Sequence, residues 1–461
     1  MPGNPHFTVK NQIESPRIRF GQHENLPFHN ILSNKAETLA SEYMPNTRDR
    51  IFSPYVTLSA FISQSLSADG SCKKAAANVA AERAAIGLPE CSSNTGSYCN
   101  ARLRLSEDFI YSLVTDSGHS LDRQSNSEWK WKERPVKLAD GTTLLMADTE
   151  KNQREYPQPN SQKENAGFPI TRPVAITSLT AGGLLDYENG SCQGKETGEN
   201  ALFRQILSRQ SLVDGDILPG DSCYCSYFMI VLLQRSGVDV IFEQHGSRKT
   251  DFRKGKQIGA RDHTVILEKP QKPKWMDKEE YQQMPDTLTV REFKSKGKVI
   301  VTTILDPRYA TKNETGKLYT KRWLIEVDFL FIKTIMQMDF LRCRTPEMVR
   351  KEIGIHFLAY NLIRTIIAQS ACKTGLSPRA ISFKGTIQLL DSLGLVFIMV
   401  DEERYLILYD MMLSKIATDK ISNRAGRSEP RAVKRRPKPY PRLNESRTLD
   451  RNRSFEKKKH A

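Results

Sequence analysis

Four polar side chains recur at helical spacing in the segment LYTKRWLIEVDFLFIKTIMQM, which begins at Leu318. They are a phenol, a guanidinium, a carboxylate and an ammonium: Tyr319, Arg322, Glu326 and Lys333. At about 100° per residue, their offsets fall within roughly a 60° arc of one helix, and the apolar residues between them are predicted to face the core. An acid between two cations suits a metal ion beside phosphate groups. A solvated helix face with ordinary ion pairs has the same pattern. Residues elsewhere in the chain are therefore needed to distinguish a metal site from a solvated face.

Two further acids could complete a metal site with Glu326. Phosphoryl transfer uses two hard cations about 3.5–4 Å apart, and such cations prefer oxygen ligands held on rigid elements. Asp140 lies on the first strand of the sheet predicted below, and Asp221 lies at the end of the fourth. These positions are neighbours, and a glutamate on a later helix can close over both. Gly141 leaves room beside Asp140. Two alternatives stay open, an ordinary Asp-Gly turn for Asp140 and a helix N-cap for Asp221.

Other candidate residues fit this chemistry less well. Four acids lie nearer turns or beyond strand ends: Asp148, Asp186, Asp214 and Asp216. Asp328 lies two residues from Glu326, about 200° round the helix, so it cannot share the same face. His263 and His356 are predicted to be surface residues or satisfied core residues. The sequence has no HExxH, GxSxG, Walker or GxGxxG motif, which leaves carboxylate-held metal as the leading chemistry.

The elements that must position these acids follow from hydrophobic periodicity. Helices are predicted in residues 47–88 with a break at 69–71, near residues 101–114, and in ENALFRQILSRQ and YFMIVLLQRSG. Strands are predicted in VKLADGTTLLMAD, in a hairpin turning at residues 181–183, in DGDILPGD and in VDVIFEQH. After a polar insertion, KVIVTTILD is a buried strand, the helix of Tyr319 follows, and residues 346–372 form another amphipathic helix. This order predicts an α/β fold, a mixed five-stranded sheet with one antiparallel strand and covering helices, as in the ribonuclease H-like architecture.

A chain of 461 residues is long enough for more than one domain. We predict six segments: a helical N-terminal region at 1–125, the first part of the sheet domain at 126–245, a β-rich insertion at 246–298, the second part of the sheet domain at 299–345, a C-terminal helical region at 346–419, and a disordered basic tail at 420–461.

Positive charge is concentrated in the tail. Residues 420–461 contain fifteen Lys or Arg and four Asp or Glu, and therefore supply +11 of the net charge of +16. This uneven placement predicts a polyanionic partner bound with release of counterions; a solubilising appendage is the alternative. No apolar stretch approaches a membrane span, and the N-terminus lacks the apolar core of a secretory signal, so no membrane partner is expected. The eight scattered cysteines fit free thiols in a reducing cytosol.

The spacing Tyr-x2-Arg-x3-Glu-x6-Lys is met at all four positions, and with it the chain resembles the type-four insertion-sequence transposases, the YREK group of the DDE superfamily. The resemblance runs from about residue 49 to residue 364. It includes ADGTTLLMADTEKNQREYPQ around Asp140, GKETGENALFRQIL, GDILPGDSCYCSY and LRCRTPEMVRKEIGIHFLAYNLIR. It implies that Asp140, Asp221 and Glu326 form an acidic triad that binds two Mg²⁺ ions, for which Mn²⁺ can substitute.

The same resemblance implies a DNA transposase that cuts and pastes its element. A water activated by metal attacks at the element's end, and the freed 3′-hydroxyl is the nucleophile for hairpin formation and for insertion into target DNA. Tyr319 and Arg322 would grip phosphates near the end, Lys333 would make a second phosphate contact, and Trp323 would contact the DNA beside them or pack. The N-terminal helices would recognise terminal inverted repeats, and the insertion would hold a flipped or hairpinned end. A homodimer would pair the ends in a synaptic complex, in the bacterial cytoplasm and associated with the nucleoid.

One departure from the family pattern follows the second aspartate. The family commonly has Arg or Gly there, then a small residue and an aromatic, whereas this chain has Ser222, Cys223 and Tyr224. A basic residue is therefore missing beside the predicted metal site. The departure keeps open a catalytically weakened relic that still binds and pairs DNA ends. A ribonuclease H-fold nuclease without a transfer step is a further alternative.

Overall fold

The computed structural model describes residues 28–45, 51–85, 87–89, 91–421, 445–446 and 448–453. The beginning of the N-terminal region and most of the basic tail, which we predicted to be disordered, lie outside these residues. Within the tail, residues 448–453 are helical, which the composition did not predict. The Ser446 hydroxyl accepts a hydrogen bond from the Leu449 N–H at 3.4 Å, and Arg453 pairs with Glu445 at 2.9 Å. These local contacts stabilise the helical turn.

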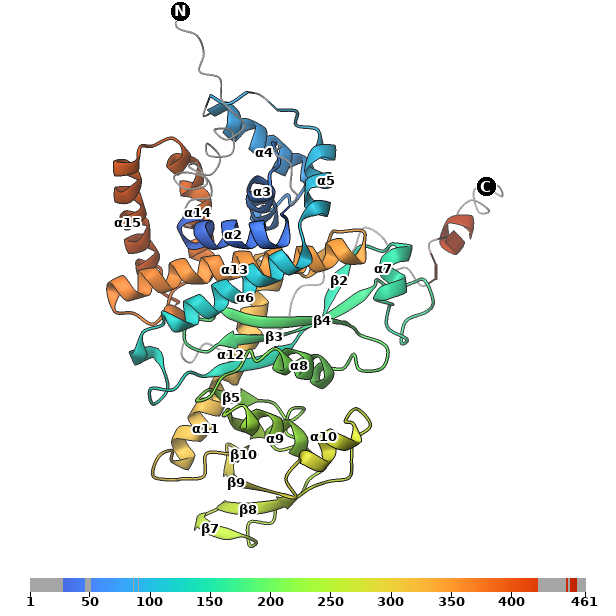
Figure 1. Ribbon diagram of the computed structural model, residues 1–461, viewed down its shortest axis with the longest axis vertical. Helices are drawn as coiled ribbons and strands as arrows, with labels where there is room; N and C mark the ends of the chain where they lie inside the picture. Colours follow the sequence, from blue (N-terminus) through green and yellow to red (C-terminus); the bar gives the residue numbers. More distant parts are fainter. Residues whose placement is uncertain are drawn as a thin grey trace, which may run out of the picture.

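A mixed sheet forms the centre of the molecule (Figure 1). Its central strands, in spatial order, are β4 (Leu184–Ser191), β3 (Ile170–Ser178), β1 (Lys137–Gly141), β5 (Ile217–Gly220) and β6 (Asp239–Glu243). β3 is antiparallel to β4 and β1, β5 and β6 are parallel, and a parallel bridge between Val136 and Ile217 joins β1 to β5. The predicted mixture of strand directions is confirmed, with β3 running against the other four. Two short strands extend the sheet on the β1 side of β3: β2 (Leu144–Met146) pairs with β3, and β11 (Phe340–Leu341) pairs with β2.

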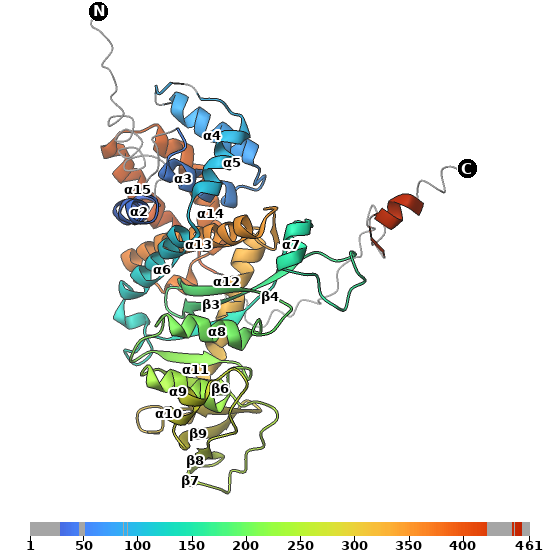
Figure 2. The ribbon, with the colours of Figure 1, turned by 45° about the vertical axis from the view of Figure 1, so that its right-hand side comes forward.

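The hairpin of β3 and β4 turns where the sequence predicts. Gly182 has a φ of +78°, a conformation that glycine adopts without steric cost. Both strands are buried over most of their length, because helices cover both faces of the sheet (Figure 2). The covering helices are α6 (Glu107–Arg123) and α13 (Pro346–Thr374) on one face and α8 (Glu199–Ser208) on the other.

Beyond β6 the sheet continues into the region predicted as an insertion. The strand next to β6 is β10 (Lys298–Thr302), which was predicted as the buried strand after the insertion. The insertion itself contributes, in spatial order, β9 (Thr287–Ser295), β8 (Asp262–Glu268) and β7 (Lys256–Gly259). Each is antiparallel to its neighbour, and β10 is antiparallel to β6. A short helix, α10 (Lys278–Gln283), begins at Asp277, whose carboxylate accepts a hydrogen bond from the Glu280 N–H. This lobe therefore extends the central sheet, at the lower end of the molecule in Figure 1.

Short helices gather at the opposite end of the molecule from the lobe. They are α2 (His29–Tyr43), α3 (Pro54–Leu66), α4 (Cys72–Ala85) and α5 (Thr95–Arg104). The predicted break at residues 69–71 separates α3 from α4. The prediction of one helix near residues 101–114 is wrong, because α5 ends at Arg104 and α6 begins at Glu107. The Ser106 hydroxyl accepts a hydrogen bond from the Phe109 N–H at 3.4 Å and so caps the new helix.

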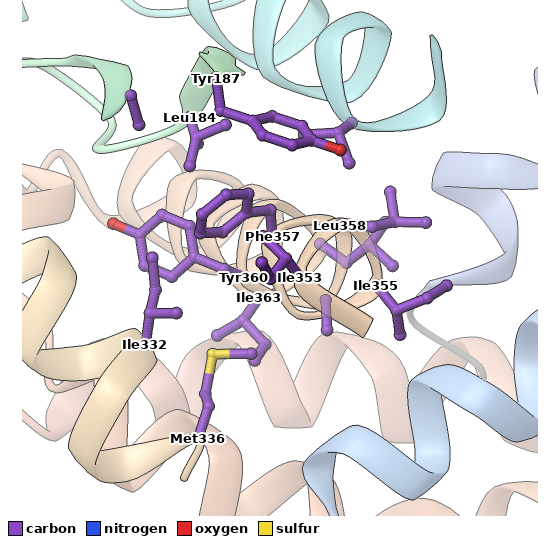
Figure 3. Close-up of a cluster of buried hydrophobic side chains, with 14 of the residues drawn as sticks. Leu184, Tyr187, Ile332, Met336, Ile353, Ile355, Phe357, Leu358, Tyr360 and Ile363 are labelled. Atoms are coloured by element: carbon purple, nitrogen blue, oxygen red, sulfur yellow. The ribbon is translucent and has the colours of Figure 1, made fainter. Parts of the chain in front are cut away.

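Helix α13 is the centre of the larger hydrophobic core (Figure 3). The prediction that it is amphipathic is wrong, because its residues are buried on all sides over most of its length. It packs against α3, α6, α14 (Phe383–Ile398) and α15 (Glu402–Thr418), so apolar residues are needed on every face. The rings of Phe357 on α13 and Tyr187 on β4 meet edge to face, with their centroids 4.9 Å apart. Within the described part of the chain, no helix has both the length and the apolar character that crossing a bilayer requires.

The segment predicted as one regular helix changes its hydrogen-bond pattern along its length. It consists of α11 (Lys312–Thr320), a 3₁₀ turn η2 (Lys321–Trp323), α12 (Leu324–Leu330) and a π-helical turn η3 (Phe331–Ile335). The prediction of a uniform α-helix is therefore wrong in detail, since 3₁₀ and π turns rotate residues relative to a regular α-helix. The segment passes beside β1 and ends against α13, which brings its polar side chains to the edge of the sheet that carries the predicted acids.

Candidate active site

Asp140 is the penultimate residue of β1, opposite Ala175 of β3. Its Oδ1 accepts a hydrogen bond from the Gly141 N–H at 2.9 Å, and its side chain is 17% exposed. Burial and the nearby carboxylates of Glu199 and Asp221 together raise the pKa of Asp140 to about 7, against the opposing effects of the Gly141 N–H and Arg322. Asp140 and Gly141 are the last two residues of a paired strand, a position that also agrees with the alternative of an ordinary Asp-Gly at the end of a strand. Negative charge is crowded around Asp140.

Asp221 directly follows β5, the strand joined to β1 by the parallel bridge. Its Oδ1 accepts a hydrogen bond from the Cys223 N–H at 2.7 Å. The alternative that Asp221 caps the next helix is wrong. Helix α9 (Tyr227–Arg235) begins after Ser226, whose hydroxyl accepts the Met229 N–H at 3.3 Å. Parallel neighbours end at the same edge of a sheet, so the ends of β1 and β5 present Asp140 and Asp221 together.

Arg322 joins the helical segment to the end of β1. Its Nη2 donates a hydrogen bond to Glu326 Oε1 at 3.0 Å, and its Nη1 lies 3.6 Å from Asp140 Oδ2. The guanidinium therefore contacts one acid from the strand and one from the helix. Glu326 has a side chain that is 56% exposed, so it is free to turn toward a ligand at this edge.

The other two residues of the predicted helix face, and Trp323 beside them, have different surroundings. Tyr319 is buried, and its hydroxyl donates to Glu243 Oε2 at 2.8 Å. Burial and the Glu243 carboxylate raise the pKa of Tyr319. The Lys333 ammonium donates to the Thr143 carbonyl oxygen at 2.9 Å, just beyond Asp140 in the chain. Trp323 lies in the 3₁₀ turn and is 55% exposed. Lys333 and Arg322 thus contact the β1 edge, whereas Tyr319 is directed toward the end of β6.

Asp328 does not share the face of Glu326, as predicted, and it faces the interior. It is fully buried and accepts hydrogen bonds from Arg364 at 2.8 Å and from the Arg379 guanidinium. Thr177 of β3 donates to the same carboxylate at 3.3 Å. Arg364 lies on α13, so this buried ionic network holds α12 against both the sheet and the central helix. It positions Glu326 by fixing the helix that carries it.

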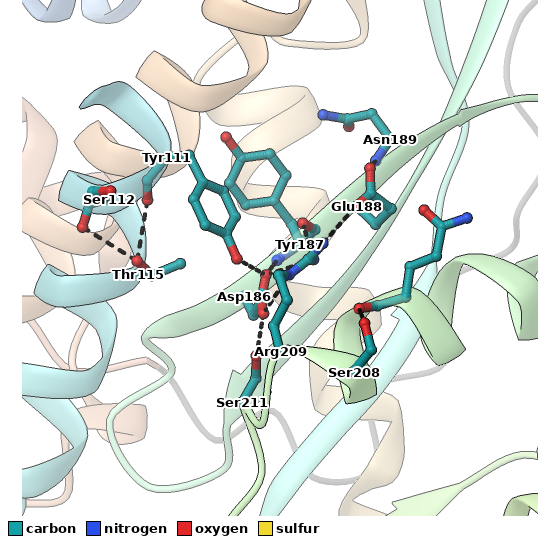
Figure 4. A network of polar contacts seen from close by, with 11 residues as sticks. Tyr111, Ser112, Thr115, Asp186, Tyr187, Glu188, Asn189, Ser208, Arg209 and Ser211 are labelled. Carbon is teal, nitrogen blue, oxygen red and sulfur yellow. Dashed lines mark hydrogen bonds and ion pairs between the residues drawn. The ribbon is translucent and has the colours of Figure 1, made fainter. Parts of the chain in front are cut away.

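Two of the four competing acids, Asp186 and Asp216, are buried and have structural partners. Asp186 on β4 is buried and accepts hydrogen bonds from Tyr111 at 2.9 Å, from Arg209, and from Ser211 (Figure 4). Asp216 is buried near Lys137, with 3.8 Å between Asp216 Oδ1 and Lys137 Nζ. These contacts join α6, β4 and the turn after α8. They give these acids a packing role.

The two histidines are core residues with different hydrogen bonding. Both ring nitrogens of His263 have partners, the Lys254 carbonyl oxygen at 2.6 Å and Glu292 at 3.3 Å, as predicted for a satisfied core residue. His356 is buried on α13, and its Nδ1 has no hydrogen-bond partner among the described residues. The prediction of a satisfied residue is therefore wrong for His356. Burial and the nearby Arg342 charge together lower its pKa to about 3.

Glu199, the first residue of α8, lies beside the site and was not predicted. Its carboxylate packs over Gly141: a Cβ built on Gly141 would meet Glu199 Oε2 at 3.1 Å. The hydroxyl of the buried Tyr224 donates to Glu199 Oε1 at 2.6 Å. The glycine after Asp140 was the one signal in the sequence, and it does not identify the side chain that occupies the space.

The donor set has the chemistry for hard divalent cations. Among the described residues, no three His, Cys, Asp or Glu side chains already form a group that could hold a metal ion. Asp140 and Glu326 instead share the Arg322 guanidinium, and Asp221 acts on both Asp140 and Arg322 through its charge. Carboxylate oxygens suit hard cations such as Mg²⁺ or Mn²⁺. The residues therefore fit such ions once Arg322 moves aside.

A family model described as the transposase DDE domain matches residues 131–362, about half of the chain. This range contains Asp140, Asp221 and Glu326. The chain is similar to "Transposase InsG for insertion sequence element IS4" of Escherichia coli (strain K12), with 27% identity over 356 residues, 74% of this chain and 76% of the relative. A solved piggyBac transposase synaptic complex with hairpin DNA has 10% sequence identity and a TM-score of 0.44, over 90% of this chain and 88% of that chain. The chain belongs to the DDE transposases of the IS4 family, the proteins of insertion sequences that carry out DNA transposition.

Proposed function

We propose that the chain binds the terminal inverted repeats of its own insertion sequence and moves the element by metal-dependent strand cleavage and strand transfer. The observation that carries this proposal is the contact of Arg322 with both Asp140 and Glu326. It brings an acid of the first strand and an acid of a distant helix to one guanidinium, next to the strand end that precedes Asp221. Membership of the DDE transposases supports the same function.

The central domain is proposed to be ribonuclease H-like. The strand order β4–β3–β1–β5–β6, with β3 antiparallel to the others, supports this assignment. β1 carries Asp140, and β5, the fourth of the five central strands in chain order, ends immediately before Asp221. Helices on both faces leave this edge of the sheet for chemistry.

Asp140, Asp221 and Glu326 would hold two Mg²⁺ ions, for which Mn²⁺ can substitute. When bound, the two cations supply positive charge to the attacking and leaving oxygens of phosphoryl transfer. Asp140 lies in a rigid strand and orients the pair, whereas the exposed Glu326 closes from the helix. Arg322 would exchange its carboxylate partners for a DNA phosphate, since a guanidinium binds phosphate in the same bidentate manner.

Tyr319, Arg322, Trp323 and Lys333 would contact DNA near the element's end. The exposed Trp323 ring can stack on a base that leaves the duplex. Lys333 already lies at the chain just beyond Asp140, where a phosphate beside the metal site would be within reach. Tyr319 would have to leave Glu243 to reach a phosphate. Otherwise its role is to fix the entry of the helical segment.

Further parts of the proposal rest on the family alone. The N-terminal helices would recognise the terminal inverted repeats, the lobe at residues 246–298 would hold a flipped or hairpinned end, and two copies of the chain would pair the ends before target DNA is attacked. These reactions would take place in the bacterial cytoplasm, on the nucleoid.

A cleavage assay tests this function. The substrate is linear DNA that carries the inverted repeats flanking the reading frame, incubated with Mg²⁺ or Mn²⁺. We expect cuts at the repeat ends with the wild-type chain, and loss of cutting with retained end binding for Asp140→Asn, Asp221→Asn and Glu326→Gln. Full cutting by Glu326→Gln, with unchanged end binding, would overturn the assignment. Cutting without joining to a second DNA would instead favour a nuclease without a transfer step.

A second candidate function is end binding without chemistry. Ser222 stands where the family commonly has a basic or glycine residue, in the turn that carries Asp221, so a positive charge is missing beside the site. A gel shift on repeat DNA with no nicked product in Mn²⁺ would identify such a relic. Cutting restored by Ser222→Arg would show which charge had been lost.

A further inference from the structure

Glu199 occupies the space between the two strand ends that carry the predicted metal ligands. It is the first residue of α8, whose N-cap is Gly198. Its Oε2 would lie 3.1 Å from a Cβ at residue 141, so the glycine at this position allows the carboxylate to approach β1 beside Asp140. A side chain at residue 141 would push the carboxylate away.

The other oxygen of Glu199 is fixed to the turn that follows Asp221. The Tyr224 hydroxyl donates to Oε1 at 2.6 Å, and the Cys223 thiol lies 3.7 Å from the same oxygen. The Tyr224 ring is fully buried and packs edge to face on Phe203 of α8, with centroids 4.9 Å apart. Tyr224 is therefore a rigid donor that sets the direction of the carboxylate.

A second contact ties the same helix to the same turn. The Asn200 side-chain amide donates to the Cys223 carbonyl oxygen at 2.8 Å. At the N-terminus of α8, the side chains of Asn200 and Glu199 thus contact a backbone carbonyl and a side chain of the turn that follows Asp221. Glu199 Oε2 faces the strand of Asp140. Glu199 spans the two ligand-bearing elements.

No cation balances this acid in the part of the chain that the structure describes. Its hydrogen bonds there come from a phenol and a thiol, and no Lys, Arg or His lies within ion-pair distance. Packing alone would favour a neutral glutamine here, because like charges a few ångströms apart repel strongly in a half-buried site.

We propose that Glu199 is a fourth acidic residue of the active site, a positioning residue that orients the turn of Asp221 and strengthens the binding of divalent cations by the triad. This inference rests on the proposed function. Glu199 would not bind the metal itself. It would add negative charge near the ligands and hold the turn of Asp221 through Tyr224. Residues that orient metal ligands in this way raise metal affinity about 10- to 100-fold.

Direct measurement of Mn²⁺ binding to the full chain without DNA tests the inference. Isothermal titration calorimetry gives the affinity, and thermal melting reports the fold. Glu199→Gln keeps the size of the side chain and an acceptor for Tyr224 but removes the charge, and we expect about tenfold weaker Mn²⁺ binding with an unchanged melting temperature. Tyr224→Phe keeps the ring packing and removes the donor, and should weaken binding in the same direction.

Two controls separate the possible failures. Glu196→Gln removes an exposed acid three residues away that pairs with Arg204, and should leave Mn²⁺ affinity unchanged. If Asp140→Asn weakens Mn²⁺ binding but Glu199→Gln and Tyr224→Phe do not, the inference is overturned while the proposed function stands. If Asp140→Asn binds Mn²⁺ as well as the wild-type chain does, the metal site itself is refuted. A lowered melting temperature for both Glu199→Gln and Tyr224→Phe, with unchanged affinity, would reduce Glu199 to a packing role.

Discussion

Arg322 reaches from the helical segment to the end of β1, where its Nη1 lies 3.6 Å from Asp140 Oδ2. The same guanidinium donates to Glu326, so one protein cation lies between two acids that are proposed to bind metal. A guanidinium and a divalent cation cannot occupy the same place. Metal binding and phosphate binding are therefore coupled: DNA that draws Arg322 away frees the carboxylates.

The Arg322→Ala variant separates these two effects. Without DNA, it should bind Mn²⁺ a few-fold more tightly than the wild-type chain, because the competing charge is gone. With DNA, it should cut less, because a phosphate contact is lost. Calorimetry and a cleavage assay measure the two quantities. Lys321→Ala, which removes an exposed charge from the neighbouring residue, is the matched control. Weaker Mn²⁺ binding by Arg322→Ala would contradict the competition.

Substitutions of the two acids on α12 should affect different properties, stability for Asp328 and cleavage for Glu326. Asp328→Ala leaves the buried Arg364 without a carboxylate partner, and removing one partner of a buried ion pair costs about 3–5 kcal/mol. Glu326→Gln changes an exposed side chain and should leave stability nearly unchanged while abolishing cleavage. Urea unfolding gives the free energies. Equal stability of the two variants would show that the Asp328 network does not hold the helix.

His356 should destabilise the fold in acid. Its pKa falls from an ordinary 6.5 to about 3 on folding, because burial and then Arg342 disfavour the charged form. The fold holds the neutral ring, so this contribution is fully present above pH 6.5 and is lost as pH falls from 6.5 toward 3. The slope there is about 1.4 kcal/mol per pH unit. The difference in unfolding free energy between the wild-type chain and His356→Gln should shrink over that range. A difference that stays constant between pH 6.5 and pH 3 would show that His356 does not cause the loss of stability in acid.

The basic tail should act as a DNA-binding appendage. A chain ending at Ile421 keeps the backbone hydrogen bond from the Ile421 N–H to Ala380 and loses most of the excess positive charge. It should bind random DNA more weakly, with a flatter dependence on salt, because fewer counterions are released. Filter binding across a salt series measures the slope. An unchanged slope would leave the tail with a solubilising role only.

Sequence patterns predicted the elements that depend on local chemistry. The glycine turn of the β3–β4 hairpin, the strand of Asp140 and the strand end before Asp221 lie where they were expected. The placement of Asp328 on a different face from Glu326 also followed from helical geometry. Each of these depends on a few neighbouring residues, and short-range rules capture such features well.

What could not be predicted depends on contacts between distant segments. Helix α13 looked amphipathic because its charged residues mark a polar face, yet Arg364 is buried against Asp328 from another helix. Glu199 and Tyr224 are in contact because α8 packs across the ends of β1 and β5, and no residue spacing in the sequence predicts that contact. The 3₁₀ and π turns around Glu326 likewise depend on packing against the sheet.

The most direct test of the metal site is a crystal structure of the chain bound to repeat-end DNA in Mn²⁺, with anomalous scattering to locate the ions. We expect two Mn²⁺ peaks about 3.5–4 Å apart, contacted by Asp140, Asp221 and Glu326, with Arg322 moved onto a phosphate. Manganese bound elsewhere, with Arg322 still between Asp140 and Glu326 in a cleavage-competent complex, would contradict the proposed chemistry.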